Sequence, residues 1–108
     1  MNECTIDQVG TKRWRLNGLF HRDDGPAIEY NNGDKFWIYN GNYHREDGPA
    51  VVMANGSKEW YLNGKRHRED GPAIEWYDGE KWWYLNGIKY TKEEFILLQF
   101  SKGIIINE

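Results

Sequence analysis

Three related copies of one stretch decide the fold of this chain, and the third copy reads Trp60-Tyr61-Leu62-Asn63-Gly64-Lys65-Arg66-His67-Arg68-Glu69-Asp70-Gly71-Pro72-Ala73. A truncated copy stands at each end of the array. His-Arg pairs begin at His21, His44 and His67, at intervals of 23 residues, and Asn-Gly pairs recur with the same period. A fixed period of this length is typical of repeat proteins, in which each unit buries an apolar face against its neighbours. The sequence therefore predicts a stack of similar units.

Each unit contains two apolar runs with a turn signal between them. In one unit, residues 27–30 precede Asn32-Gly33 and residues 35–39 follow it. Asn-Gly between two such runs is the strongest short-range hairpin signal, because a type I′ turn needs positive φ at both central residues. We therefore predict one β-hairpin per unit. The expected fold class is mostly β, a twisted antiparallel sheet of about six to eight strands built from stacked hairpins.

The chain departs from the repeat pattern after residue 90 and predicts a C-terminal capping α-helix at residues 91–102. Thr91 and Glu94 form a capping box, and Gly103 is a suitable stop signal. Such a helix would close the open end of the sheet, as terminal units of repeat proteins require. We expect a single domain over residues 1–108, with repeats at 10–90 and a tail at 103–108.

Apolar residues of the predicted helix spread over more than one face, which is more than a one-sided cap uses. The tail adds Ile104, Ile105 and Ile106 to this surplus. Two arrangements are expected from it. The region from Phe95 to Ile106 either mediates self-association or binds a partner, or the tail folds back on the sheet as a strand.

Alternation along the strands sorts the side chains onto two faces of the sheet. One predicted face is apolar in every unit and should be buried, with Trp14, Trp37, Trp60 and Trp83 in one column and Ile28, Val51 and Ile74 beside it. The opposite face changes from unit to unit, and a column that varies is solvent-facing or fitted to something outside the stack. An alternative is that its aromatic residues cover a second face or simply suit strands. The candidate partner-binding residues on this face are Phe36, Ile38, Tyr61, Trp82 and Tyr84.

The link between hairpins repeats a His-Arg-acid-Asp-Gly-Pro string, whose residue types also occur in metal and catalytic sites. Equivalent positions on successive hairpins are two strands apart, roughly 9.5 Å at about 4.8 Å per strand. A metal ion binds histidine nitrogens at about 2.0–2.1 Å, so the histidines of a regular stack cannot share one ion. We predict a structural ladder in which Arg and Asp tie one loop to the next. Its members are His21, His44, His67, Arg22, Arg45, Arg68, Asp24, Asp47 and Asp70.

No pattern of residues indicates catalysis, because Ser57 and Ser101 lie outside any strand-turn-helix context and the glycines mark turns. We expect no enzyme activity, no cofactor and no metal. A basic cluster could hold a small anionic ligand such as a nucleotide, although nearby acids balance its charge as they do on a solvated face. This cluster consists of Lys12, Arg13, Arg15 and Arg22.

Composition and charge exclude further classes of function. The chain has 108 residues, a net charge of −3 and a single cysteine, Cys4. Because a binder of phosphate backbones needs a concentrated Lys/Arg surface, nucleic acid is not an expected partner. The apolar runs are too short to span a membrane, and the N-terminus does not resemble a signal peptide. The default expectation is therefore a cytoplasmic protein without a membrane partner.

The repeat resembles a known family. Residues 60–67, the turn at Asp78-Gly79 and the 23-residue spacing resemble the membrane occupation and recognition nexus (MORN) repeat. More closely, Gly-x-x-His-Arg-x-Asp-Gly-Pro-Ala is similar to a variant repeat found in small proteins of bacteriophages and large DNA viruses. The resemblance covers about residues 10–90. It implies stacked hairpins that serve as a protein or lipid scaffold, and the absence of the family's His-Gly-x-Gly string argues against lipid.

A viral setting, which this resemblance implies, favours a small effector in the host cytoplasm that binds and inhibits a host protein, such as a component of an antiviral defence complex. Protein interfaces favour Tyr, Trp and Phe at their centres, and this chain has six Trp and seven Tyr. Two alternatives stand beside this expectation. One is a binder of a small anionic ligand, and the other is a homo-oligomeric scaffold that associates through the C-terminal helix.

Overall fold

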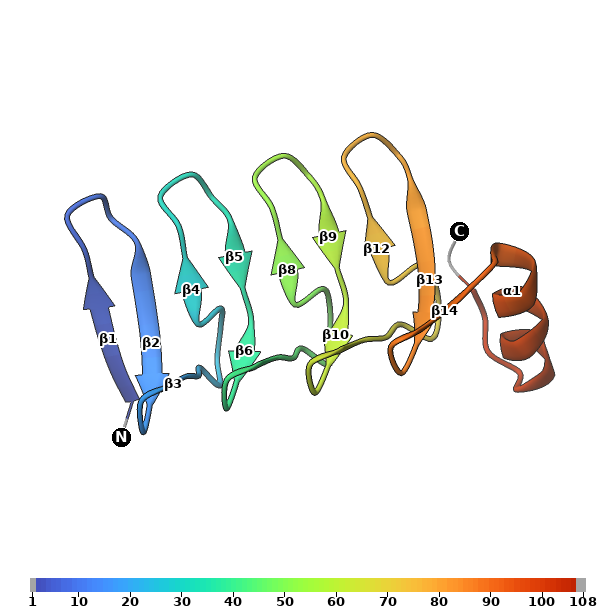
Figure 1. The fold of residues 1–108 in the computed structure, drawn as a ribbon, viewed down its shortest axis with the longest axis horizontal. Coiled ribbons are helices and arrows are strands. Elements are labelled where there is room, and N and C mark those ends of the chain that lie inside the picture. Colours follow the sequence, from blue (N-terminus) through green and yellow to red (C-terminus); the bar gives the residue numbers. More distant parts are fainter. Residues whose placement is uncertain (1, 107–108) are drawn as a thin grey trace.

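The computed structural model describes residues 2–106 and is a row of β-hairpins standing side by side, with a helix at the C-terminal end (Figure 1). The molecule measures 47 × 29 × 18 Å, so it is elongated along the row. Neighbouring strands of the main sheet pair antiparallel, and the sheet is open rather than closed on itself. The predicted fold class is confirmed.

Ten strands form the main sheet, in the order β1-β2-β4-β5-β8-β9-β12-β13-β14 with β3 paired to β2. The strand β1 carries no copy of the repeat, and it completes the first hairpin by pairing along the whole of β2. The sheet is therefore larger than the repeats alone predict. The bounds are β1 Asn2–Ile6, β2 Lys12–Leu16, β3 Leu19–Phe20, β4 Ile28–Glu29, β5 Lys35–Phe36, β8 Val51–Val52, β9 Lys58–Glu59, β12 Ile74–Glu75, β13 Lys81–Leu85 and β14 Ile88–Tyr90.

Each unit also contains a second, shorter hairpin, which corrects the prediction of one hairpin per unit. β6 (Ile38–Tyr39) pairs with β7 (Asn42–Tyr43), and β10 (Tyr61–Leu62) pairs with β11 (Lys65–Arg66). The turn between β6 and β7 has φ 49° at Asn40 and φ 83° at Gly41. These two positive angles are those of a type I′ turn, which Asn-Gly adopts at little cost. The type I′ geometry thus belongs to the second Asn-Gly pair of each unit.

The long hairpins turn differently from the prediction. The Tyr30 N–H donates to the Asp34 carbonyl, and the Gly33 N–H donates to the Tyr30 carbonyl. Positive φ occurs at Gly33 but not at Asn32. This is a three-residue loop with a glycine bulge, not a two-residue type I′ turn. The extra loop residue shifts the register by one, and such a shift moves side chains to the other face of the sheet.

The observed register therefore overturns the predicted buried face. Ile28 lies opposite Phe36 in the ladder, and Ile74 lies opposite Trp82. The aliphatic residues thus share a face with the residues that vary between units. The tryptophans stand on the other face, where they are only half-buried, and these are Trp14, Trp37, Trp60 and Trp83.

The core follows the aliphatic column and consists of small clusters. Ile38 and Tyr84 belong to it and are 5% and 8% exposed. Sharing a core along a row suits a short chain, because a small domain buries only a modest fraction of its surface. One cluster contains Ala27, Ile28 and Ile38 with Phe20 and Phe36, and another contains Ala73, Ile74 and Tyr84 with Trp60, Trp76 and Trp82.

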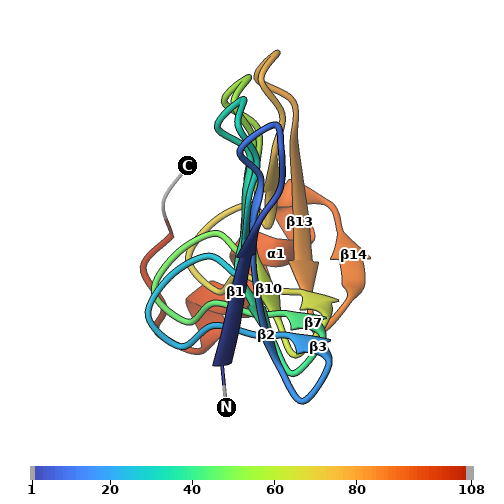
Figure 2. The ribbon, with the colours of Figure 1, turned by 90° about the vertical axis from the view of Figure 1, so that its left-hand side faces the viewer.

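The link loops are residues 21–26, 44–49 and 67–72. Viewed along the row, they project from one side of the sheet, and the short hairpins project from the other side (Figure 2). The tips of the long hairpins extend away from both the link loops and the short hairpins (Figure 2). Side chains on one face of the sheet therefore lie beside the link loops, and those on the other face lie beside the short hairpins. This difference decides which side chains are accessible.

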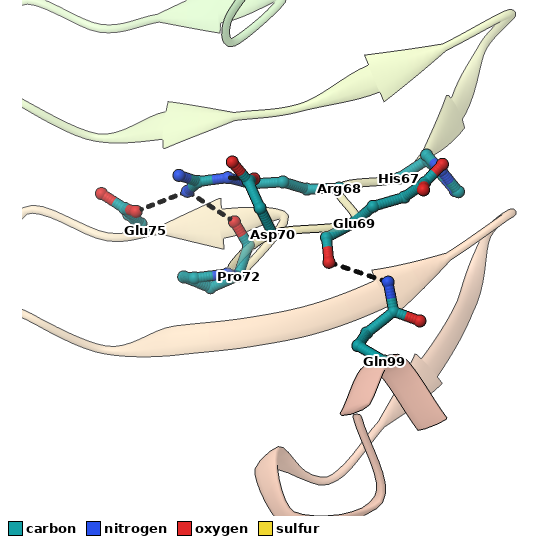
Figure 3. A network of polar contacts seen from close by, with 7 residues as sticks. All are labelled: His67, Arg68, Glu69, Asp70, Pro72, Glu75 and Gln99. Atoms are coloured by element: carbon teal, nitrogen blue, oxygen red, sulfur yellow. Dashed lines mark hydrogen bonds and ion pairs between the residues drawn. The ribbon is translucent and has the colours of Figure 1, made fainter. Parts of the chain in front are cut away.

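The helix α1 (Lys92–Ser101) begins at the predicted capping box, in which Thr91 and Glu94 bond each other's backbone. It buries Phe95 and Gln99, and the Gln99 side-chain amide donates to the Glu69 carbonyl at 2.8 Å (Figure 3). Gly103 has φ 75° and ends the helix as predicted. Residues 104–106 form no strand, so the described part of the tail does not join the sheet, and residues 107–108 lie outside the described residues.

Candidate functional site

A row of aromatic side chains runs along the face of the sheet opposite the link loops, and we call it the aromatic face. Successive rings touch from Tyr30 to Phe36, from Phe36 to Tyr43 and from Tyr43 to Tyr61, with centroids 5.7, 6.0 and 5.1 Å apart. The rings of Trp76 and Trp82 pack edge to face, with centroids 6.4 Å apart. Such contacts hold aromatic rings in fixed orientations. The aromatic face consists of Tyr30, Phe36, Tyr43, Tyr61, Trp76 and Trp82.

Cationic side chains cover parts of the aromatic face. The Arg66 guanidinium lies 5.9 Å from the Tyr61 ring centroid and 5.4 Å from that of Tyr84. The Lys89 ammonium lies 3.9 Å from the Trp82 centroid. Each cation is attracted to the ring face and adds to its rigidity. The rings of the aromatic face are therefore held in place, while part of their surface stays exposed to solvent.

A polar network sits at the centre of the aromatic face. The Tyr61 hydroxyl donates to Glu59 at 2.8 Å and accepts from the Arg66 Nε–H at 3.2 Å. Burial raises the pKa of Tyr61 to about 12, and the hydrogen bond to Glu59 and its negative charge act in the same direction. The neutral phenol is thus the form that the folded protein favours.

This pKa predicts a loss of stability in alkali. Tyrosines of an unfolded chain ionise at about pH 10, so the preference for neutral Tyr61 contributes fully to stability below that pH. The contribution is lost as the pH rises through the folded value of about 12. Urea unfolding between these values should show a stability that falls less steeply in Tyr61→Phe than in the wild type. An identical slope in both proteins would contradict the assignment, and Tyr77→Phe serves as the exposed control.

The predicted partner-binding residues divide into two groups. Phe36, Tyr61 and Trp82 are partly exposed on the aromatic face. Ile38 and Tyr84 belong to the core, so they offer little surface to a partner. The prediction did not include Tyr43 and Tyr30, which are 37% and 40% exposed on the same face. Tyr43 lies in the short hairpin, and the second Asn-Gly pair is the sequence signal that could have located it.

Each link loop places an arginine on a tryptophan. The guanidinium carbons of Arg22, Arg45 and Arg68 lie 3.9 Å from the ring centroids of Trp14, Trp37 and Trp60. This geometry explains why the tryptophans are half-buried without a second layer of apolar residues, because a guanidinium stacks on an aromatic ring. An arginine therefore covers each of these three tryptophans.

The arginines of the predicted ladder bond the aspartates of their own loops, whereas the prediction tied one loop to the next. Arg68 donates to Asp70 at 2.9 Å, to the Pro72 carbonyl at 3.2 Å and to Glu75 at 2.9 Å (Figure 3). Arg22 and Arg45 donate to Asp24 and Asp47 in the same way, and the bond from Arg22 lowers the pKa of Asp24. The Arg-acid-Asp-Gly-Pro string thus builds a clamp inside each unit.

The histidines supply one of the connections between units. The Nδ1 atoms of His21, His44 and His67 accept the backbone N–H of Asn40, Asn63 and Asn86 at 2.9–3.0 Å. Because Nδ1 accepts, Nε2 carries the hydrogen and faces the acid two residues later. Each histidine therefore fastens a link loop to the type I′ turn of the following unit. Among residues 2–106, no group of three or more His, Cys, Asp or Glu could hold a metal ion.

Removing one such connection should weaken the stack measurably. His67→Ala removes the acceptor of the Asn86 N–H, which is exposed and can bond to water instead, so we expect the free energy of unfolding to fall by about 0.5–1.5 kcal/mol. His67→Asn places an amide oxygen near the position of Nδ1 and should lose less. The direct measurement is hydrogen exchange of the Asn86 amide, which should accelerate in the alanine variant. Unchanged exchange in that variant would rule out the proposed connection.

The predicted basic cluster is not brought together. Arg13 and Arg15 lie on the aromatic side of the sheet, where Arg13 pairs with Asp7 at 3.0 Å and Arg15 lies over Phe20. Arg22 lies on the other side, on Trp14, and pairs with Asp24 and Glu29. The sheet separates these guanidinium groups, so they do not form one anion-binding site.

Two recesses lie between successive link loops, and Trp37 lines one while Trp60 lines the other. Their walls carry the arginines and acids of the clamps, so the charges there are already paired.

Comparison of the chain with protein-family models, with curated proteins and with solved structures finds no match. The helix in the described part of the chain is too short to cross a membrane.

Proposed function

We propose that this protein is a non-enzymatic protein-binding module that contacts its partner through the aromatic face. The observation that carries the proposal is the unbroken series of ring contacts from Tyr30 to Tyr61, which stays partly exposed on the side away from the link loops. Tyrosine, tryptophan and arginine are the residue types that dominate binding energy at protein interfaces. Rings that are already fixed lose little conformational entropy when a partner binds.

A protein partner accounts for this face better than the other ligand classes. The net charge of −3 does not suit a phosphate backbone. The predicted basic cluster offers a small anion no convergent site, because Arg13 and Arg15 are separated from Arg22 by the sheet. The histidine, arginine and aspartate side chains that recur in the link loops bond to other groups of the protein, which supports a structural role for them.

The resemblance to viral repeat proteins extends the proposal to the kind of partner. On that basis, the protein acts in the cytoplasm of a host cell, where it binds and inhibits a host protein such as an antiviral defence component. A homo-oligomeric scaffold is the competing function, and Leu97 and Phe100 on the exposed side of α1 favour it.

Affinity capture from host lysate tests the proposal, with mass spectrometry for proteins and small molecules. We expect one stoichiometric protein. Its binding free energy for the Tyr43→Ala variant should be weaker by about 2 kcal/mol or more, as for a hot-spot residue. Tyr77→Ala removes an equally large, exposed ring from a hairpin tip and should bind normally. Phe36→Ala and Trp82→Ala then map the length of the contact.

Three results would overturn the proposal. The first is equal binding by Tyr43→Ala and the wild type. The second is recovery of a nucleotide in place of a protein, and the third is recovery of this chain alone.

A further inference from the structure

The first strand, β1, leaves one edge of the main sheet open. It stands at the end of the strand order, and all five of its residues are exposed. At the opposite end of the row the helix α1 packs against β13 and β14 (Figure 1). No element within residues 2–106 covers β1 in the same way. An open edge presents unpaired N–H and C=O groups that can pair with another strand.

The hydrogen bonds of β2 show which groups of β1 are free. The Trp14 N–H donates to the Ala27 carbonyl and the Trp14 carbonyl accepts from His21, so this residue directs its backbone away from β1. Successive residues of a strand direct their backbone groups to opposite sides. Arg13 and Arg15 therefore direct theirs toward β1.

The register then assigns the groups of β1. Arg13 lies opposite Thr5, and Arg15 lies opposite Glu3, so Thr5 and Glu3 use their backbone groups inside the hairpin. Asn2, Cys4 and Ile6 alternate with them. Their N–H and C=O groups point outward from the sheet, at the spacing of an antiparallel ladder.

We propose that a second copy of this chain adds its β1 to this edge, antiparallel and related by a two-fold axis beside Cys4. In this register Cys4 faces Cys4 of the second copy, Asn2 faces Ile6, and Glu3 faces Thr5. All three outward residues find a hydrogen-bonding partner, and no like charges stand opposite each other. β1 contains no proline and no lysine, which are the residues that commonly protect an edge.

A second copy fits the edge better than an unrelated strand, because the match is self-complementary and closes. A two-fold contact uses the same patch on both partners and leaves no open β1 edge behind. The interface is confined to one short strand from each copy, so the dimer should form in a concentration-dependent manner. The two aromatic faces remain outside it.

Sedimentation in reducing buffer over a range of concentrations tests the dimer, using Cys4→Ser and Cys4→Pro. Serine keeps the outward N–H and should dimerise like the wild type. Proline removes that N–H, which does not serve the β1–β2 hairpin, and also fixes the backbone φ at this position. It should raise the dimer dissociation constant at least about tenfold. Circular dichroism and melting confirm that the proline variant is folded, and Ile6→Lys provides a second edge-blocking variant.

Cross-linking with a short bifunctional thiol reagent tests the register. The wild type should cross-link through Cys4. In a Cys4→Ser background, Glu3→Cys mixed with Thr5→Cys should cross-link more efficiently than either variant alone. A wild type that stays monomeric at all concentrations would overturn the proposal, and so would a dimer that both edge-blocking variants retain.

Discussion

Phe95→Ala is expected to lower the free energy of unfolding by about 3–5 kcal/mol, the usual cost of removing a fully buried phenylalanine. The side chain is 0% exposed and holds α1 against the end of the sheet. Its loss leaves a cavity and loosens the helix, whose other buried anchor is Gln99. Urea unfolding with the slope m measured in both proteins gives the change directly.

Phe100→Ala is the matched control, because it removes the same side chain from the same helix. Phe100 is 71% exposed, so the substitution should change stability by less than about 0.5 kcal/mol. If the two variants lost equal stability, the orientation of α1 would be wrong. Phe100→Ala also removes part of the exposed apolar surface of α1. Measuring the mass of this variant in solution therefore also tests self-association through the helix.

Trp60→Ala should be the second most damaging substitution, at about 3 kcal/mol. Trp60 packs against the cluster that contains Ile74, and its other side carries the Arg68 guanidinium. Truncation removes apolar contacts on one side and the support of the arginine clamp on the other. The expected loss lies at the lower end for a tryptophan because the ring is only half-buried.

A double-mutant cycle separates these two contributions. Arg68→Met keeps the apolar stem of the side chain but removes the guanidinium. The coupling between Trp60→Ala and Arg68→Met should be about 0.5–1 kcal/mol or more, as for other cation–π pairs. Strict additivity would show that the stacking contributes nothing. Tyr77→Ala, at an exposed hairpin tip, gives the baseline for loss of an aromatic ring.

The sequence was sufficient to predict the repeat, the class of fold and the cap. A period of 23 residues with Asn-Gly turns leaves few structures other than stacked hairpins. The capping box of Thr91 and Glu94 located the start of the helix, because these interactions are local. The Arg-acid-Asp-Gly-Pro string was predicted to tie one loop to the next, whereas its arginines bond the aspartates of their own loops.

The assignment of faces failed for one physical reason. Asn32-Gly33 can close either a two-residue or a three-residue loop, and the local sequence does not distinguish them. The observed three-residue loop moved Ile28 to the side of Phe36, so two candidate binding residues, Ile38 and Tyr84, became core. Exposure of Tyr43 followed from the short hairpin that the prediction lacked.

The sequence by itself determined the elements that depend on residues close in the chain, namely the repeat period, the turns and the helix cap. Only the tertiary structure decided which units touch and through which atoms. The bond from Asn40 to His21 joins residues 19 positions apart, and that from Gln99 to Glu69 joins residues 30 apart. Such bonds depend on strand register and on the docking of the helix. A local pattern carries no record of either, because both are set by packing between distant segments.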